Sequence, residues 1–427
     1  MSVVLLAACA APAARVAGPP DVPPGAERRY AIWLGGAQVG TALETEVWTR
    51  DGVTVERHES MRFLRGDAAV ALTTTIEITA DRGLAPSRVT WREHGQAERR
   101  GEAVRDATGW TVTDAAGVRH LPAAAIPAEL APLIVRRDGA FAGPLFLPAR
   151  GFVLGAGRIT AVAPRRLIAR LVFDRAAEVT DGATVAVPGD PAAAPGATTA
   201  EATIDLGDDA MPIRVVDGEG VIATRITAAE AARPFAPVDL IAATAIPIAG
   251  EPSHRLALDG DLALPPVPGQ AAQAVPDGAL LELSPRLAGH LPPGVRGADR
   301  TREIAALVAQ VGRRIAPDLA ADAGSPRTAA SATAGDCTTF ALAYTALAAS
   351  RAIPTLVVTG FRVERSRLVR HRWAVSWTGR AWIAVDAAFG AVPAGGDLVG
   401  LAIHDADDVG LVAGEAALTH VRAATWR

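Results

Sequence analysis

The chain has 427 residues, of which 50% are hydrophobic and 21% are charged, and its formal net charge is −4. This length indicates two or three domains, and the apolar content excludes a wholly disordered protein. The acidic balance and the lack of a basic cluster argue against nucleic-acid binding, which needs clustered cations. Lys and Asn are absent, which excludes a catalytic lysine, an orienting asparagine and an Asn-linked glycan. The two cysteines, Cys9 and Cys337, are too few for a disulfide framework.

The first ten residues form a short apolar run that contains Cys9. The run is too short to span a bilayer. The small residues before Cys9 resemble the lipobox of bacterial lipoprotein signals, which implies a lipid anchor on this cysteine. No arginine precedes the run, as a signal peptide usually requires, and the alternative is an ordinary apolar segment with an incidental thiol. We expect residues 1–25 to be a signal and an Ala/Pro-rich tether, with the protein in the cell envelope, facing the periplasm, and membrane attachment by lipid only.

A region with a two-residue hydrophobic period follows the tether. The alternation runs through Tyr30, Ile32 and Leu34, continues from Val39 to Val47, and returns from Val70 to Ile78. Asp-Gly at positions 51 and 52 is typical of a hairpin turn. These patterns predict an antiparallel sheet with one buried face. We expect residues 26–245 to form a mostly β N-terminal domain.

Shorter candidate strands follow within the same region, at 111–113, 166–173, 202–206 and 213–216. The segment beginning at Gly218 formally fits a dinucleotide-binding fingerprint, but it follows an Asp-Gly hairpin signal and no βαβ unit comes after it. We therefore reject a nucleotide site there and expect no cofactor. The Pro-rich residues 246–296 are interpreted as a connecting segment that contains at most one or two strands.

The pattern changes to helical spacing in the C-terminal part, residues 297–427. Apolar residues at Ile304, Leu307, Val308 and Val311 predict a helix that Pro317 stops, and 338–351 predict a second helix. Three candidate strands follow at 355–361, 368–377 and 380–386. Helices followed by antiparallel strands indicate an α+β domain.

Cys337 is the first candidate for chemistry in this domain. It lies at the start of the second predicted helix, where unsatisfied N–H groups and the helix dipole favour a thiolate. Gly335 allows a tight entry into that helix. A nucleophilic cysteine also needs a base, usually histidine, and a group that orients the histidine.

His371 and Asp386 are the expected partners of this cysteine. If Thr378 and Gly379 form a two-residue hairpin loop, His371 lies directly opposite Asp386, with Cβ atoms about 5 Å apart. A carboxylate there would accept the Nδ1 proton of the imidazole and fix its tautomer.

Four short motifs in this domain resemble the bacterial transglutaminase-like core. They lie at 335–337 (GDC), 351–354 (RAIP), 371–373 (HRW) and 382–386 (WIAVD), in the order and at the spacing typical of that family. The resemblance covers about a fifth of the chain. It implies a C-terminal papain-like fold in which Cys337 is the nucleophile, His371 the base and acid, and Asp386 the orienting group.

Two positions depart from the family pattern. Ala352 stands where glycine is usual, and Ala387-Ala388 follows Asp386 in place of the common Pro-Thr, so the next loop is expected to differ. Each site residue also has a simpler interpretation as a buried thiol, a structural strand residue or a turn former. Asp397 or Asp405 could replace Asp386 as the orienting group. Trp373, Trp377 and Trp382 are interpreted as core residues around the site, Asp336 as a helix cap, and His404 and His420 as structural. No spacing indicates a metal site.

The resulting hypothesis is cysteine-dependent acyl transfer on amide bonds of a peptide or protein through a thioester. Hydrolysis, as by a protease or amidase, is the expected outcome. A cross-linking transglutaminase would use the same residues with an amine as acceptor, and a catalytically silent, peptide-binding envelope protein is an alternative of another class. The sequence does not indicate an oligomeric state.

Overall fold

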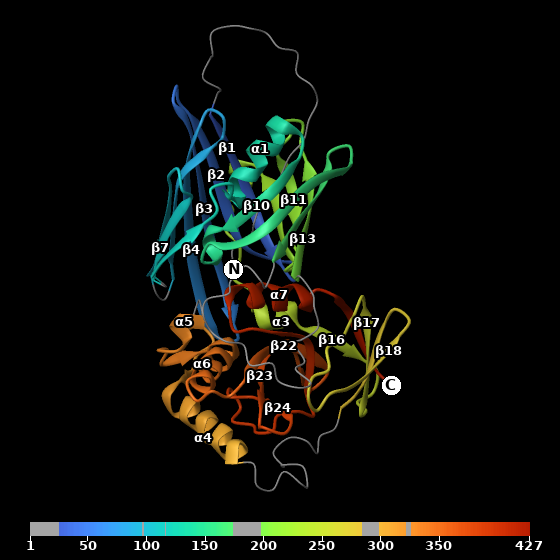
Figure 1. Ribbon diagram of the computed structural model, residues 1–427. Helices are drawn as coiled ribbons and strands as arrows, with labels where there is room; N and C mark the ends of the chain where they lie inside the picture. The colour runs from blue at the N-terminus through green and yellow to red at the C-terminus, as the bar shows by residue number, and fades with distance from the viewer. Residues whose placement is uncertain (1–24, 96–97, 116, 174–197, 284–298, 322–325) are drawn as a thin grey trace. The chain divides into compact units, whose positions relative to one another are not determined.

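The computed structural model describes residues 25–95, 98–115, 117–173, 198–283, 299–321 and 326–427, and Figure 1 shows its elements. The described residues form two compact units, the first comprising most of those up to Val238 and the second those from Asp239 to Arg427. Strand residues predominate in both units, and most of the helical residues lie in the second. The described chain is therefore mostly β, with a smaller helical part.

The described residues of the first unit contain one sheet of fifteen strands, in the spatial order β8-β7-β6-β5-β4-β3-β2-β1-β15-β14-β13-β12-β11-β10-β9. Sequence neighbours are mostly joined by antiparallel hairpins, whereas β9 and β10 are parallel. The strands are β1 (Ala26–Leu34), β2 (Ala37–Trp48), β3 (Gly52–Arg65), β4 (Ala68–Asp81), β5 (Pro86–His94), β6 (Glu98–Arg105), β7 (Trp110–Asp114), β8 (Gly117–Leu121), β9 (Ile126–Pro127), β10 (Phe141–Leu147), β11 (Val153–Ala163), β12 (Arg166–Phe173), β13 (Thr198–Leu206), β14 (Pro212–Val216) and β15 (Val221–Ile226). The longer helices of this unit are α1 (Ala131–Asp138) and α2 (Ala228–Ala231).

The predicted alternation is confirmed in β1 and β4. Tyr30, Ile32 and Leu34 are buried, as are Ile76 and Ile78, so these strands place their apolar side chains on one face. The segment at Gly218 forms the turn between the paired strands β14 and β15, which confirms the predicted hairpin. Strands β10 and β11 and helix α1 were not predicted.

Strand β2 buries Val39 as expected, but from Ala42 on it buries the face opposite to the predicted one. Glu44 and Glu46 are 6% and 2% exposed, whereas Val47 on the opposite face is 57% exposed. Buried charges require partners, and Glu44 accepts a hydrogen bond of 3.0 Å from Arg28 while Glu46 accepts one of 3.1 Å from Arg136. The alternation of apolar residues alone gave the wrong buried face because paired charges can also occupy an interior.

The second unit contains a sheet in the order β18-β19-β17-β26-β16-β23-β22-β25, and β24 pairs with β23 outside this path. Its strands are β16 (Ile246–Ala249), β17 (Arg255–Gly260), β18 (Ala271–Val275), β19 (Gly278–Glu282), β22 (Thr355–Glu364), β23 (Arg367–Trp377), β24 (Trp382–Val385), β25 (Leu398–His404) and β26 (Val421–Trp426). A separate parallel pair joins β20 (Ala316–Pro317) to β21 (Ala334–Gly335). The helices are α3 (Leu240–Thr244), α4 (Asp299–Arg314), α5 (Pro326–Ala329), α6 (Cys337–Ala349) and α7 (Asp408–Leu418).

The Pro-rich segment, interpreted from the sequence as a connection with at most one or two strands, supplies several strands to this sheet. Residues 246–283 form four strands, and β17 pairs with both β19 and the last strand β26. Leu256, Leu258 and Leu281 from these strands are buried in the same cluster as Trp426. The described part of this segment is therefore integral to the second unit. Strands can form in it because its proline residues lie mostly between them.

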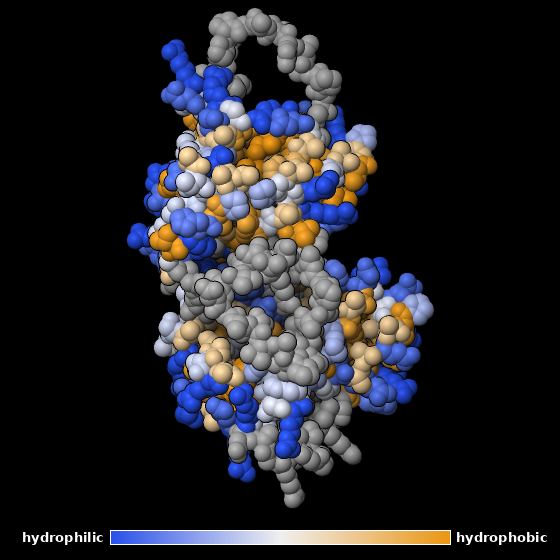
Figure 2. All heavy atoms as spheres, in the orientation of Figure 1, coloured by the Kyte–Doolittle hydropathy of each residue, from blue (hydrophilic) through white to orange (hydrophobic). Residues whose placement is uncertain are grey.

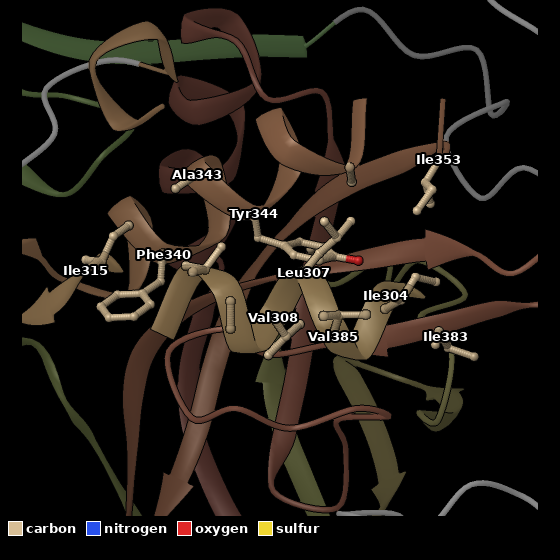
Figure 3. Close-up of a cluster of buried hydrophobic side chains, with 14 residues drawn as sticks. Ile304, Leu307, Val308, Ile315, Phe340, Ala343, Tyr344, Ile353, Ile383 and Val385 are labelled. Carbon is tan, nitrogen blue, oxygen red and sulfur yellow. The ribbon is translucent and has the colours of Figure 1, made fainter. Parts of the chain in front are cut away.

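Helices α4 and α6 pack together against β23 and β24, as Figure 3 shows. Ile304, Leu307 and Val308 of α4 are at most 4% exposed and contact the cluster that includes Phe340 and Tyr344 of α6. The helical spacing predicted for α4 is confirmed, and the helix ends at Arg314, three residues before Pro317. This packing fixes the axis of α6 and thus the position of its first residue, Cys337.

The surface includes an exposed edge strand, β18, whose five side chains are all exposed. Figure 2 shows hydrophilic and hydrophobic residues side by side over the part of the surface that β17 and β18 occupy. Among the described helices, none has the length and apolar character that crossing a membrane demands. The predicted lipid-attachment residue Cys9 lies outside the described residues.

Candidate active site

Cys337 is the first residue of α6, as the sequence predicted. Asp336 caps the helix, its carboxylate accepting a hydrogen bond of 3.1 Å from the backbone N–H of Thr339. A Cβ atom on Gly335 would lie 2.3 Å from the side chain of Thr339, which is fully buried. Glycine at 335 is therefore required by this close approach, and it allows the chain to enter the helix with Cys337 partly exposed.

His371 on β23 and Asp386 after β24 are in direct contact. The imidazole Nε2 donates a hydrogen bond of 2.8 Å to Asp386 Oδ2, and the two residues are 7% and 2% exposed. The predicted register was wrong, however, because Trp377 pairs with Trp382 and Ala374 with Val385. Asp386 is thus two positions away from the place opposite His371. The nitrogen that faces the carboxylate is also Nε2, not the expected Nδ1.

The protonation of His371 reflects its two polar partners. Burial lowers the pKa of His371, but a hydrogen bond to Asp386, a hydrogen bond to Cys337 and the negative charges of both groups outweigh burial and raise it to about 10. Nε2 faces Asp386, so Nδ1 is the nitrogen that this carboxylate leaves available. The raised pKa favours the imidazolium form of His371 at neutral pH.

The loop after Asp386 is organised by the same carboxylate. Its second oxygen, Oδ1, accepts hydrogen bonds from the backbone N–H groups of Ala388 (3.1 Å) and Phe389 (3.4 Å). The backbone of Asp386 exchanges two hydrogen bonds with Ala391 and closes the loop. One oxygen of Asp386 therefore orients the imidazole, and the other holds the loop that departs from the family pattern.

Aromatic side chains surround the imidazole. Trp373 is parallel to the His371 ring, with centroids 5.9 Å apart, and it is 1% exposed, as expected of a core residue. Trp377 and Trp382 contact each other, with ring centroids 5.8 Å apart. Phe389 meets the imidazole at 69° with centroids 5.5 Å apart and is 57% exposed. Phe389 was not identified from the sequence, although its place three residues after a candidate aspartate was visible there.

A buried arginine beside the site was also missed. Arg372 is 6% exposed and donates hydrogen bonds to Thr338 Oγ1, Thr359 Oγ1 and Glu415 Oε1, at 3.0, 3.0 and 2.6 Å. Thr338 directly follows Cys337, and Glu415 lies on α7. Arg372 therefore ties the first turn of α6 and helix α7 to the sheet beneath them.

The other candidates from the sequence occupy different places. Asp397 forms an ion pair of 2.7 Å with Arg362, and the backbone oxygen of Asp405 accepts a hydrogen bond from His404 Nδ1. His420 Nδ1 contacts the backbone oxygen of Asp261 at 3.2 Å. Of the three aspartates considered as orienting groups, Asp386 is the one in contact with His371. In the described ranges, no group of three or more His, Cys, Asp or Glu residues is arranged to hold a metal ion.

Comparisons with known proteins support the family resemblance of this segment. Residues 289–387 match the model of the Transglutaminase-like superfamily, a range that includes Cys337, His371 and Asp386. No curated protein matches the chain. Among solved structures, a beta-barrel-like protein of the domain of unknown function DUF1849 from Brucella abortus is matched at 12% identity and a TM-score of 0.26, over 47% of this chain and 95% of that one.

Proposed function

We propose that the second unit is a cysteine-dependent acyltransferase acting on amide bonds, with Cys337 as nucleophile, His371 as acid and base, and Asp386 as orienting group. The observation that carries this proposal is the buried hydrogen bond of 2.8 Å between His371 Nε2 and Asp386, together with an electrostatic influence of Cys337 that helps to raise the pKa of His371. The family match over 289–387 supports the same chemistry and a papain-like arrangement of helix and sheet. The pair is buried, which strengthens its electrostatic interaction.

The reaction begins when the Cys337 thiolate attacks the carbonyl carbon of an amide. The backbone N–H of Cys337, which has no partner within its own helix at this first position, stabilises the oxyanion. His371 donates its Nδ1 proton to the amide nitrogen as the C–N bond breaks, which leaves a thioester and a free amine. Water then loses a proton to His371 and attacks the thioester, and the C–S bond breaks to give a carboxylic acid and the thiolate.

Hydrolysis is the outcome we propose, because water is the acceptor that needs no binding site of its own. A primary amine that attacked the thioester instead would give a cross-linked product with the same residues. We also propose that the protein is held in the cell envelope by a lipid on Cys9. Radiolabelled palmitate incorporation into the wild-type chain and its absence from Cys9→Ala tests this location.

The activity is tested in a Cys9→Ala background, where Cys337 is the only thiol. The protein is incubated with a mixture of cell-wall and protein-derived peptides, with and without a fluorescent primary amine, and products are compared with those of Cys337→Ala by mass spectrometry. New carboxyl termini that depend on Cys337 indicate hydrolysis, and incorporation of the amine indicates transfer. If Cys337 is alkylated by iodoacetamide at pH 7 no faster than free cysteine, the proposal is wrong and a peptide-binding role is favoured.

A further inference from the structure

Phe389 is a large hydrophobic side chain that lies beside the candidate active site and is exposed to solvent. It is 57% exposed, and it is the one aromatic residue among the exposed large hydrophobic side chains of the described chain. A single exposed apolar residue is common and needs no explanation by itself. Phe389 differs because its ring lies 5.5 Å from the ring of His371.

The backbone of Phe389 is held in place by the site itself. Its N–H donates to Asp386 Oδ1 at 3.4 Å, and the neighbouring Ala388 N–H donates to the same oxygen at 3.1 Å. Two backbone hydrogen bonds between Asp386 and Ala391 join the ends of the loop that carries Phe389. Phe389 is therefore fixed by the carboxylate that orients His371, so its ring is preorganised relative to the imidazole.

One face of the Phe389 ring is already occupied. The guanidinium of Arg362 lies 3.6 Å from the ring centroid, and its Nε is held by Asp397 at 2.7 Å. His371 approaches the ring at 69°. The residue is still 57% exposed, so part of the ring is open to solvent. An exposed aromatic surface, fixed next to a reacting group, is suited to contact with a bound molecule.

We propose that Phe389 forms the apolar wall of a substrate subsite next to His371, and that the substrate presents an apolar or aromatic group to the exposed part of the ring. This inference rests on the function proposed above and adds a substrate class to it. A basic group is disfavoured there, because Arg362 already places a cation on one face of the ring. The assignment makes Phe389 a specificity residue, which acts on the choice of substrate and not on proton transfer.

The test compares two alkylating reagents with the same reactive carbon, iodoacetamide and N-benzyl-iodoacetamide, on the full chain in the Cys9→Ala background. The measured quantity is the ratio of the two second-order rate constants for Cys337, divided by the same ratio for free cysteine. We expect the wild-type value to be about 3 to 10, the range that one aromatic pair contributes. Phe389→Ala should reduce it to about 1, and Phe389→Trp should retain it.

Val275→Ala is the matched control, because it also removes an exposed hydrophobic side chain but lies on β18, outside the site. This variant should keep the wild-type ratio, and circular dichroism and thermal melting check the folding of each variant. A wild-type ratio of 1, or an unchanged ratio in Phe389→Ala, overturns the subsite while fast reaction with iodoacetamide still supports the proposed function. Slow reaction of the wild type with both reagents instead rejects the proposed function together with the subsite.

Discussion

Replacing Asp386 by alanine is expected to change the ionisation of the whole site. The rise of the pKa of His371 from 6.5 to about 10 corresponds to roughly 5 kcal/mol in favour of the imidazolium, at about 1.4 kcal/mol per pH unit. Burial acts in the opposite direction, and the hydrogen bond to Asp386 is the largest of the contributions that raise the pKa. Without this carboxylate, the imidazole should be mostly neutral at pH 7, and the thiolate loses its counter-charge.

The assay is the rate of alkylation of Cys337 by iodoacetamide between pH 5 and 10. In the proposed mechanism the His371 imidazolium stabilises the attacking thiolate, so the wild-type rate at pH 6.5 should be well above that of Asp386→Ala. In Asp386→Ala the rate at pH 6.5 should be roughly 100-fold below its plateau, since a thiol of ordinary acidity ionises near pH 8.5. The matched control is Asp259→Ala, which removes an exposed aspartate of the same unit on β17, outside the site. Coincident profiles for the wild type and Asp386→Ala would refute the assigned role of Asp386.

Three further predictions concern the surroundings of the site. Gly335→Ala should lower the free energy of unfolding by about 1–3 kcal/mol, because the new Cβ overpacks against buried Thr339. Urea denaturation measures the free energy, and an unchanged value would contradict the close approach of residues 335 and 339. Arg372→Gln should lower the free energy of unfolding by about 3 kcal/mol and slow the alkylation of Cys337, because it removes a buried cation and its hydrogen bond to Thr338. Arg372→Lys keeps the charge, so it should recover part of the stability and part of the alkylation rate. Because the pKa of His371 is raised in the folded state, its contribution to stability is full below pH 6.5 and is lost as the pH rises towards 10. The difference in unfolding free energy between the wild type and Asp386→Asn should therefore shrink between pH 6.5 and 10. A difference that grows with pH would contradict the raised pKa.

The contact between His371 and Asp386 was predictable from the sequence although the register was not. The hairpin turn is formed one residue later than expected, since the backbone N–H of Thr378 donates to Ala381 O at 3.0 Å and the two loop residues are Gly379 and Arg380. Moving a hairpin turn by one residue shifts every opposing pair by two. A shift of two keeps side chains on the same face of a sheet, so the imidazole still reaches the carboxylate.

Contacts that depend on distant segments could not be predicted in this way. Arg372 reaches Glu415 on α7, 43 residues away, and no local pattern indicates that this helix lies over the sheet. Phe389 follows Asp386 closely in the chain, but its exposure and its contact with Arg362 depend on the pairing of β22 with β25. Sequence patterns indicate periodicity and local turns, whereas these contacts require the arrangement of whole elements.

The buried charges of the first unit have a consequence for how its strands align. Arg28, Glu44 and Arg57 lie directly opposite one another across β1, β2 and β3, so that cation, anion and cation form one row on the interior face. Sliding β1 against β2 by two residues would keep every side chain on its original face, and an apolar interior would tolerate such an error. Here the same slip would place the Arg28 guanidinium opposite Ala42 in one direction, or the Glu44 carboxylate opposite Tyr30 in the other, and would separate the opposed pair at a cost of several kcal/mol. The charges thus give these strands one permitted alignment where apolar residues alone would allow several.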